Sequence, residues 1–364
     1  MARFSDVFED ITKLGRKIPK EDYLLNGNYQ IIDQGQNEIA GYSNDPEGLY
    51  TDVPVIIFGD HTRVLKFVDE PLFLGADGVK MLKIKNPSNN PRYLYYALCN
   101  ARIPDTGYNR HFKWLKEIEI PIPDVHQQHN IAVILDKVSN LIILRKQQLA
   151  KLDDLVKSRF IELFGDPETN PKGWEKGALS NHLNVVGGYA FKSELFAEDG
   201  IPVLRIGNIN AGFFQPTNMV YWKYDDSLLR YMMHSGDLVM SLTGTVGKDD
   251  YGNVCILGDE YECYYLNQRN AKLELFSTLD KYYLSQALKF SAIKKKLTGI
   301  SRGVRQANIS NRDILNLEIP IPPIDLQNEF AAFVEQTDKS KSAVKKSLEK
   351  LETLKKSLMQ QYFG

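Results

Sequence analysis

Two stretches of the chain carry apolar residues at alternating spacings of four and three positions. One lies within residues 118–165 and the other within residues 317–364. Each stripe continues for about five heptads, which is the signature of a coiled-coil helix. No proline or glycine interrupts either stripe before Gly165 or Gly364. At about 1.5 Å per residue, each stretch predicts a helix roughly 55–60 Å long.

The predicted seams consist of Ile131, Leu135, Val138, Ile142, Leu149, Leu152, Val156 and Leu163 in the first stretch, and of Phe330, Val334, Val344, Leu348, Leu351, Leu358 and Tyr362 in the second. The exceptions in this register are Arg145, Arg159, Thr337, Lys341 and Lys355. The first helix also carries apolar residues outside its seam, and one partner helix cannot easily cover them all. We therefore expect Leu141, Leu144 and Leu155 to bind a partner protein; packing against the chain's own globular blocks is the alternative.

The two stretches are copies of one another. Aligned with a constant offset of 199 and no gap, their 48 positions share 16 identities. Each copy opens with an Ile-Pro-Ile-Pro segment, at residues 120–123 and 319–322. Proline disfavours the helical backbone at the residue before it, so these segments are expected to be extended. Two copies indicate an internal duplication and not a solenoid.

Each helix follows a globular block, and the two blocks differ more than the helices do. Apolar runs separated by glycines predict strands and turns, with fewer helical segments, so we expect an α+β fold. The predicted domains are residues 1–117, 118–165, 166–316 and 317–364.

Two pairs of segments relate the blocks to each other. Residues 200–208 resemble residues 27–36, and residues 237–244 correspond to residues 52–59. Because the helices are similar and the blocks are divergent, we expect the helices to be constant parts that serve assembly and the blocks to be variable parts that read a target.

Composition is ordinary for a globular protein, and charge gives no simple guide to a partner. The net charge of −1 over 364 residues provides no global attraction for nucleic acid, so a DNA-binding surface must come from local patches. The N-terminal residues do not form a secretory signal, and no apolar run is long enough to span a membrane. Three scattered cysteines are typical of a reduced, cytoplasmic protein.

The sequence contains no convincing catalytic or metal-binding constellation. Residues 243–248 superficially resemble a phosphate-binding loop, but the glycine spacing is too short, so a turn that ends a strand is the better interpretation. His126 and His129 stand three positions apart, yet no acidic or cysteine partner is apparent, so solvated helix-entry residues are favoured over metal ligands. We expect no metal and no catalysis in this chain.

Polar and basic residues gather in the loops before both Ile-Pro-Ile-Pro segments, and further candidates lie at one place in the first block and at two places in the second. Arginine can pair with guanine, and asparagine or glutamine with adenine, so such residues can read base edges. For any one of them, a solvated surface role is the alternative. The candidate DNA contacts are Gln36, Asn109, Arg110, Lys113, Arg205, Asn208, Gln268, Arg269, Arg302, Arg305, Gln306 and Asn308.

The order of these motifs resembles that of the specificity subunits of Type I restriction–modification enzymes, over essentially the full length. The likeness is carried by the paired segments IEIPIP and LEIPIP, the long helices, and the helix exit at residues 157–167. Residues 241–247 and 266–269 add to it. Each motif is weak alone, but their order and duplication are specific.

The resemblance implies that the blocks are target recognition domains and that the helices bind modification subunits. It implies no catalysis here: two methyltransferase subunits would use S-adenosylmethionine to methylate adenine, and restriction subunits would use ATP and Mg²⁺ to move along DNA and cut it. We accordingly expect double-stranded DNA as a partner, no membrane, and no cofactor in this chain.

The duplication predicts a pseudo-two-fold axis with antiparallel helices. Each block would then read one half of an asymmetric site, with half-sites about one helical turn apart. The alternatives are an enzyme with its own nuclease or methyltransferase activity, an adaptor that binds proteins only, and a subunit of a fused restriction–methylation system.

Overall fold

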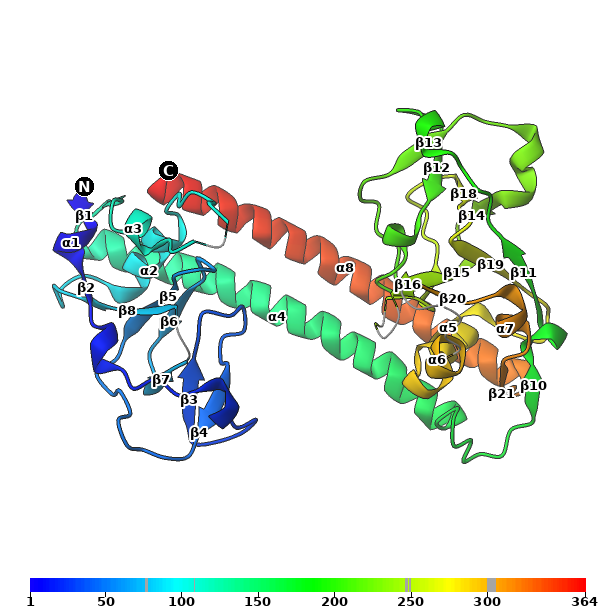
Figure 1. The fold of residues 1–364 in the computed structure, drawn as a ribbon, viewed down its shortest axis with the longest axis horizontal. Helices are drawn as coiled ribbons and strands as arrows, with labels where there is room; N and C mark the ends of the chain where they lie inside the picture. Colours follow the sequence, from blue (N-terminus) through cyan, green and yellow to red (C-terminus); the bar gives the residue numbers. More distant parts are fainter. Residues whose placement is uncertain (76–77, 108, 246–247, 249, 300–305) are drawn as a thin grey trace. The chain divides into compact units, whose positions relative to one another are not determined.

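The structure is a computed structural model that describes residues 1–75, 78–107, 109–245, 248, 250–299 and 306–364. The chain divides into two compact units, shown in Figure 1. Unit 1 comprises Met1–Gln147 and Lys345–Gly364, and unit 2 comprises Gln148–Val344. Each unit therefore holds one globular block and one end of each long helix.

The two long helices are present as predicted. They are α4 (Val125–Phe164) and α8 (Ile324–Phe363), each 40 residues long. In unit 2, Lys341 Nζ lies 2.7 Å from Asp153 Oδ1, and Arg159 pairs with Glu329. Higher numbers on α4 thus meet lower numbers on α8, which shows that the helices pair antiparallel in this unit.

The ends of the same two helices also pair in unit 1. Lys146 Nζ lies 3.2 Å from Glu352 Oε1, and Phe363 packs in the same apolar cluster as Ile131 and Ala132. This order is again antiparallel.

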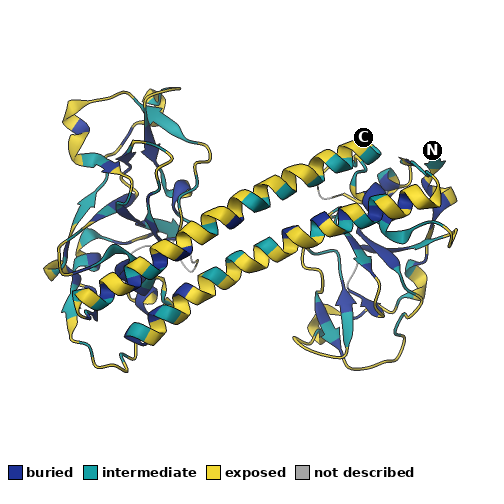
Figure 2. Cartoon of the chain, turned by 180° about the vertical axis from the view of Figure 1, so that it is seen from behind, coloured by how far each residue is buried: buried dark blue, intermediate teal, exposed yellow. Residues whose placement is uncertain are grey.

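The residues of the predicted seam are buried or half-buried (Figure 2). Two residues outside the predicted seam differ from the prediction because they are buried as well. Phe160, which the heptad register leaves out, is fully buried and stacks on Tyr283 with ring centroids 5.4 Å apart. Thr337 does not interrupt the seam, because it is buried and its hydroxyl donates to the Phe333 carbonyl at 2.9 Å. Arg159 and Lys341 are true interruptions, and both form ion pairs.

Among the residues that the structure describes, unit 1 contains two larger β-sheets and one short strand pair. The first has the order β2-β8-β5-β6, all antiparallel, and the second has the order β4-β3-β7, in which β3 and β7 are parallel. A short pair, β1 and β9, includes Ile120, the first residue of the Ile-Pro-Ile-Pro segment. The strands are β1 (Ala2–Arg3), β2 (Phe8–Asp10), β3 (Tyr29–Ile32), β4 (Gly41–Ser43), β5 (Val55–Gly59), β6 (Leu65–Val68), β7 (Leu72–Leu74), β8 (Val79–Ile84) and β9 (Glu119–Ile120).

Three helices accompany these sheets, namely α1 (Phe4–Val7), α2 (Pro91–Cys99) and α3 (Phe112–Leu115). One core joins them to one face of the first sheet and to the start of α4, and Phe58, Leu82, Leu94 and Leu115 are fully buried in it. A second core, which includes Ile57, lies between strands of the two sheets.

Unit 2 repeats this plan with additions. Its sheets have the orders β11-β19-β15-β17 and β13-β12-β18-β14, and β12 and β18 are parallel, as β3 and β7 are. The strands are β10 (Lys176–Ala178), β11 (Leu183–Gly187), β12 (Ile201–Leu204), β13 (Val220–Trp222), β14 (Met232–His234), β15 (Leu238–Ser241), β16 (Thr243–Thr245), β17 (Val254–Ile256), β18 (Cys263–Leu266), β19 (Asn270–Leu275), β20 (Gln306–Asn308) and β21 (Glu318–Pro320). The helices are α5 (Lys281–Lys289), α6 (Ser291–Thr298) and α7 (Asn311–Leu315).

The strand orders confirm the predicted duplication. Residues 27–36 and 200–208 contain the equivalent strands β3 and β12, and residues 52–59 and 237–244 contain β5 and β15. Pairs β16–β20 and β10–β21 occur in unit 2, and β10–β21 matches β1–β9 of unit 1. The protein is thus an α+β fold built from two copies of one plan. Within the described residues, no helix is both long and apolar enough to cross a lipid bilayer.

Candidate DNA-binding surface

In unit 1, the residue after the central strand β5 anchors the loop that precedes α3. The Asp60 backbone N–H donates to Gly78 O at 2.7 Å, and Asp60 O accepts from the His111 N–H at 2.8 Å. The buried Asp60 carboxylate also accepts from the Phe112 N–H at 2.7 Å. The segment with Asn109, Arg110 and Lys113 is therefore fixed at this end of the sheet.

The loop that carries Gln36 is hydrogen-bonded to the turn between β5 and β6. The His61 N–H donates to Gln34 Oε1 at 3.2 Å, and the Thr62 hydroxyl donates to Gln34 O at 2.6 Å. The ammonium group of buried Lys66, in β6, donates to Asn37 O at 2.5 Å and so fixes this loop to the sheet. The structure therefore brings the predicted contacts of unit 1 to one end of its sheet.

All four of these candidate side chains are exposed. The Asn109 amide donates to Thr106 O within its own loop, and the Lys113 ammonium lies 4.7 Å from the centroid of the Trp114 ring. Gln36 and Arg110 are also exposed. This edge of unit 1 thus offers amide and cationic donors to a ligand.

Unit 2 repeats the anchoring pattern at the end of β15. The Leu242 N–H donates to Arg269 O at 2.8 Å, and Leu242 O accepts from the Ile309 N–H at 2.8 Å. Asp60 makes the corresponding two bonds with Gly78 and His111 in unit 1. The same end of the central strand therefore gathers the candidate loops in both units.

Three candidate residues are exposed at this end of unit 2, and a fourth, Arg205, is tied to it. Gln268 and Arg269 are exposed in the connection between β18 and β19, and Asn308 is exposed in β20. The buried Asn270 amide donates to Leu204 O at 2.8 Å, which ties the end of β12, and hence Arg205, to this connection.

Two predicted contacts are instead occupied within the protein. Asn208 is only 2% exposed; its oxygen accepts from the Arg205 N–H, and its nitrogen donates to Gln215 O and Thr217 O, each at 3.0 Å. The Asn208 side chain therefore closes a loop in this structure, and its predicted base contact stays a prediction. Arg205 is half-buried, and its guanidinium donates to Asn218 O, so it also supports this loop.

The remaining candidates lie in the basic loop before α7. Arg302 and Arg305 fall outside the described residues, and they stay a prediction. The backbone of Gln306 is part of β20, where it pairs with Thr245, but its side chain is outside the description.

Acidic residues in these loops are held by the protein's own donors. The Gly107 N–H and the Arg63 guanidinium, 2.7 Å away, lower the pKa of Asp105. Likewise, hydrogen bonds from the Thr245 N–H and hydroxyl lower the pKa of Asp250. Arg63 was not among the predicted residues, because a single basic residue in a turn carries no pattern.

The sequence features that superficially resemble catalytic or metal-binding motifs lie in a strand and in a helix. Thr243–Thr245 forms strand β16, which pairs with β20, and the Lys248 N–H donates to Thr245 O at 3.0 Å, as expected for a turn that ends a strand. His126 and His129 are exposed in the first turns of α4. Among the residues that the structure describes, no group of three or more His, Cys, Asp or Glu side chains is arranged to hold a metal ion.

A different kind of surface lies along α4. Leu141, Leu144 and Leu155 are 43%, 57% and 47% exposed, and Ile143 is 52% exposed. Figure 2 shows exposed residues along this helix away from its buried seam. The extra apolar face is thus at the surface of the chain, as a docking surface would be.

Comparison with known proteins identifies the family. The sequence pattern of the Type I restriction modification DNA specificity domain matches residues 1–154 and 171–355. The chain is 28% identical over 317 residues to the Type I restriction enzyme MjaVIII specificity subunit of Methanocaldococcus jannaschii, covering 79% of this chain and 74% of that protein. It is also 24% identical over 383 aligned residues to the putative MjaX specificity subunit of the same organism, covering 98% of this chain and 83% of that protein.

The fold agrees with this relationship. The S subunit of a Type I restriction–modification system from M. genitalium has a similar structure, with a TM-score of 0.64 and 18% sequence identity, over 100% of this chain and 95% of that one. The chain belongs to the Type I restriction–modification DNA specificity family. It is thus the type of subunit that assembles with other subunits and DNA.

Proposed function

We propose that each globular block of this chain reads one half of a bipartite, asymmetric DNA site. The observation that carries the proposal is the matched anchoring at Asp60 and Leu242, which places the candidate loops at equivalent ends of β5 and β15. Because the anchors are backbone hydrogen bonds, loop sequences can differ while their position is kept. The two blocks have different loop residues, which supports different half-sites.

The direct contacts proposed for the described side chains are polar and exposed: Gln36, Asn109, Arg110, Lys113, Gln268, Arg269 and Asn308. Arg302, Arg305 and Gln306 are proposed on the sequence alone, and Arg205 is proposed to act through the loop it supports. Arginine and amide side chains suit base edges, whereas lysine suits phosphates.

We propose further that the helices hold two adenine-specific methyltransferase subunits, which in turn allow restriction subunits to join. The exposed leucines of α4 support this role. In this account S-adenosylmethionine, ATP and Mg²⁺ are bound by the partner subunits, and this chain performs no catalysis. The chain would act in the cytoplasm, where its free cysteines stay reduced.

The experiment is selection from a random duplex library by the full chain assembled with its cognate methyltransferase subunits. The proposal predicts enrichment of one split, asymmetric sequence, with an affinity that falls as salt rises. A protein-only adaptor would enrich none. Cofactor-dependent DNA cleavage or methylation by the purified chain alone would indicate an enzyme instead.

A further inference from the structure

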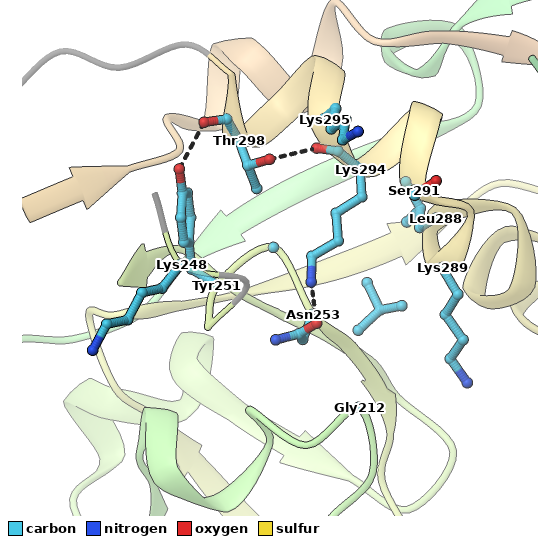
Figure 3. Close-up of a pocket in the computed structure, with 12 residues that line it drawn as sticks. Gly212, Lys248, Tyr251, Asn253, Leu288, Lys289, Ser291, Lys294, Lys295 and Thr298 are labelled. Carbon is cyan, nitrogen blue, oxygen red and sulfur yellow. Dashed lines mark hydrogen bonds between the residues drawn. The ribbon is translucent and has the colours of Figure 1, made fainter. Parts of the chain in front are cut away.

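Unit 2 contains a basic cavity of about 590 Å³ beside the end of β15. It lies between the segment after β16 and the helices α5 and α6, as Figure 3 shows. The polar residues that line it and that matter here are Lys248, Asn253, Lys289, Ser291, Lys294 and Lys295.

The wall of the basic cavity is cross-linked by hydrogen bonds. The Lys294 ammonium, in a residue only 8% exposed, donates to Asn253 Oδ1 at 2.6 Å. The Asn253 amide nitrogen donates to Asn210 O at 2.9 Å, and the Asn253 N–H donates to the Ser241 hydroxyl at 3.1 Å. These bonds connect α6 to the end of β15 through Asn253.

A second set of bonds fixes the last turn of α6. The Tyr251 hydroxyl donates to Thr298 O at 2.7 Å, and the Thr298 hydroxyl donates to Lys294 O at 3.1 Å (Figure 3). These bonds hold residues 251–253 and α6, two of the segments that line the basic cavity, in a fixed relation, which is what a preorganised binding site requires.

The lining carries four lysines and no acidic residue among the described side chains. Lys248, Lys289 and Lys294 come from three separate segments of the structure, and Lys295 follows Lys294 on α6. Four lysines in one lining favour a bound anion over a bound cation. Lysine provides three donors and no acceptor, and the Ser291 hydroxyl adds another donor, so the lining suits oxygen acceptors of an anion.

We infer that the basic cavity binds a phosphate group of the DNA backbone; this rests on the proposed DNA-reading function. Two features of its location favour DNA over a free anion. The Gly252 N–H donates to Ser241 O at 2.8 Å, which places the cavity wall at the same strand end as Arg269 and Asn308. Helix α6 also ends at Thr298, just before the basic segment predicted to read DNA.

A phosphate site also explains why the cations in the lining are lysines and not arginines. A lysine ammonium is a compact point charge without the planar fork that arginine uses to read guanine, so it suits phosphate positioning. The basic cavity would thus fix the register of unit 2 on the duplex, while neighbouring side chains select the bases.

The test uses a double variant that carries both Lys248→Ala and Lys295→Ala. It is compared with the single variant Lys296→Ala, and each variant is the full chain assembled with its methyltransferase subunits. Lys296 is the exposed neighbour on α6 and does not line the cavity, so it is a control with the same change of residue type. Lys294 is left intact because it supports Asn253. The measurement is the DNA dissociation constant at several salt concentrations, on a selected site and on a scrambled duplex.

Each phosphate contact contributes about 0.9 to the slope of log K against log salt. The double variant should lower the magnitude of that slope by about 1, weaken both duplexes equally, and leave their affinity ratio unchanged. The Lys296→Ala control should keep the wild-type slope.

An unchanged slope in the double variant, while the wild type binds DNA, would overturn the inference alone. A changed affinity ratio would assign these lysines to base reading and overturn it as well. Titration with inorganic phosphate at constant ionic strength adds a further arm: tight binding that the double variant loses, without a change in the DNA slope, would show a free-anion site. A wild type without salt-dependent DNA affinity would overturn the proposed function itself.

Discussion

Gln128 and Gln327, which are 199 positions apart, make the same hydrogen bonds in the two units. Each side-chain oxygen accepts from the backbone N–H of a helix N-cap residue, Asn90 or Asp280, at 2.8 Å. Each side-chain nitrogen donates to the last proline carbonyl of the Ile-Pro-Ile-Pro segment, at 2.9 Å to Pro123 and 2.8 Å to Pro322. This buried glutamine ties the long helix to the globular block in both copies.

Replacing either glutamine with alanine should therefore loosen one unit and not the other. The change leaves a buried donor and acceptor unpaired, at a cost of about 1–3 kcal/mol. Hydrogen exchange of the full chain should show faster exchange at the start of α2 for Gln128→Ala and at the start of α5 for Gln327→Ala. Gln127→Ala, a change at the exposed neighbour, should leave exchange unaltered. Equal effects of Gln127→Ala and Gln128→Ala would contradict this role.

The two N-cap residues allow a second comparison. Asn90 accepts from the Tyr93 N–H at 3.0 Å, and Asp280 accepts from the Tyr282 N–H at 2.8 Å and the Tyr283 N–H at 3.1 Å. Asp280→Ala should cost about 1 kcal/mol of unfolding free energy, whereas Asp280→Asn keeps a good cap and should change it by less than about 0.5 kcal/mol. Urea denaturation would measure both. If asparagine proved as damaging as alanine, the capping role would be refuted.

The pH dependence of that comparison follows from the Asp280 carboxyl. Burial raises its pKa above the ordinary 3.8, because the charged form loses hydration, although the N–H donors offset part of this. The native state then binds the proton more tightly than the unfolded state. The stability of the wild type relative to Asp280→Asn should therefore rise as pH falls through the raised pKa, and stop rising below about 3.8. A relative stability that falls on acidification would contradict the raised pKa.

The exposed face of α4 makes a prediction about assembly. Leu141→Ser with Leu144→Ser should change the stability of the isolated chain little, because both side chains are about half exposed. Methyltransferase binding should weaken, since a fully buried leucine contributes about 1.5–3 kcal/mol. Sedimentation of the mixed subunits would measure this. Leu14→Ser with Leu25→Ser, a pair of exposed leucines outside the two long helices, should leave assembly intact. Lost thermal stability with full partner affinity would contradict a docking role.

The long helices could be predicted because a heptad stripe depends on local spacing and is repeated many times. The register failed at Phe160 and Thr337, where burial is set by what packs against the helix: Tyr283 and Phe330 surround Phe160, and Thr337 satisfies its hydroxyl on the preceding turn. Neither contact is visible in the spacing of apolar residues.

The DNA-contact candidates were harder to predict from residue type. Asn208 and Asn109 are both asparagines in polar loops. Asn208 is buried and its side chain makes three hydrogen bonds, whereas Asn109 is exposed. The anchor at Asp60 was missed because its partners, Gly78 and His111, are distant in the sequence. The basic cavity combines residues from separate segments, so no single motif marks it.

The central claim, that each block independently reads one half-site, is tested most directly by methylome sequencing of cells that express a block-exchanged chain. Residues 166–316 would be replaced by the corresponding block of another family member, and the chain expressed with its cognate methyltransferase subunits. Because the first block and the long helices are kept, we predict that one half of the methylated site changes and the other half stays as in the wild type. A change in both halves, or in neither, would contradict independent reading.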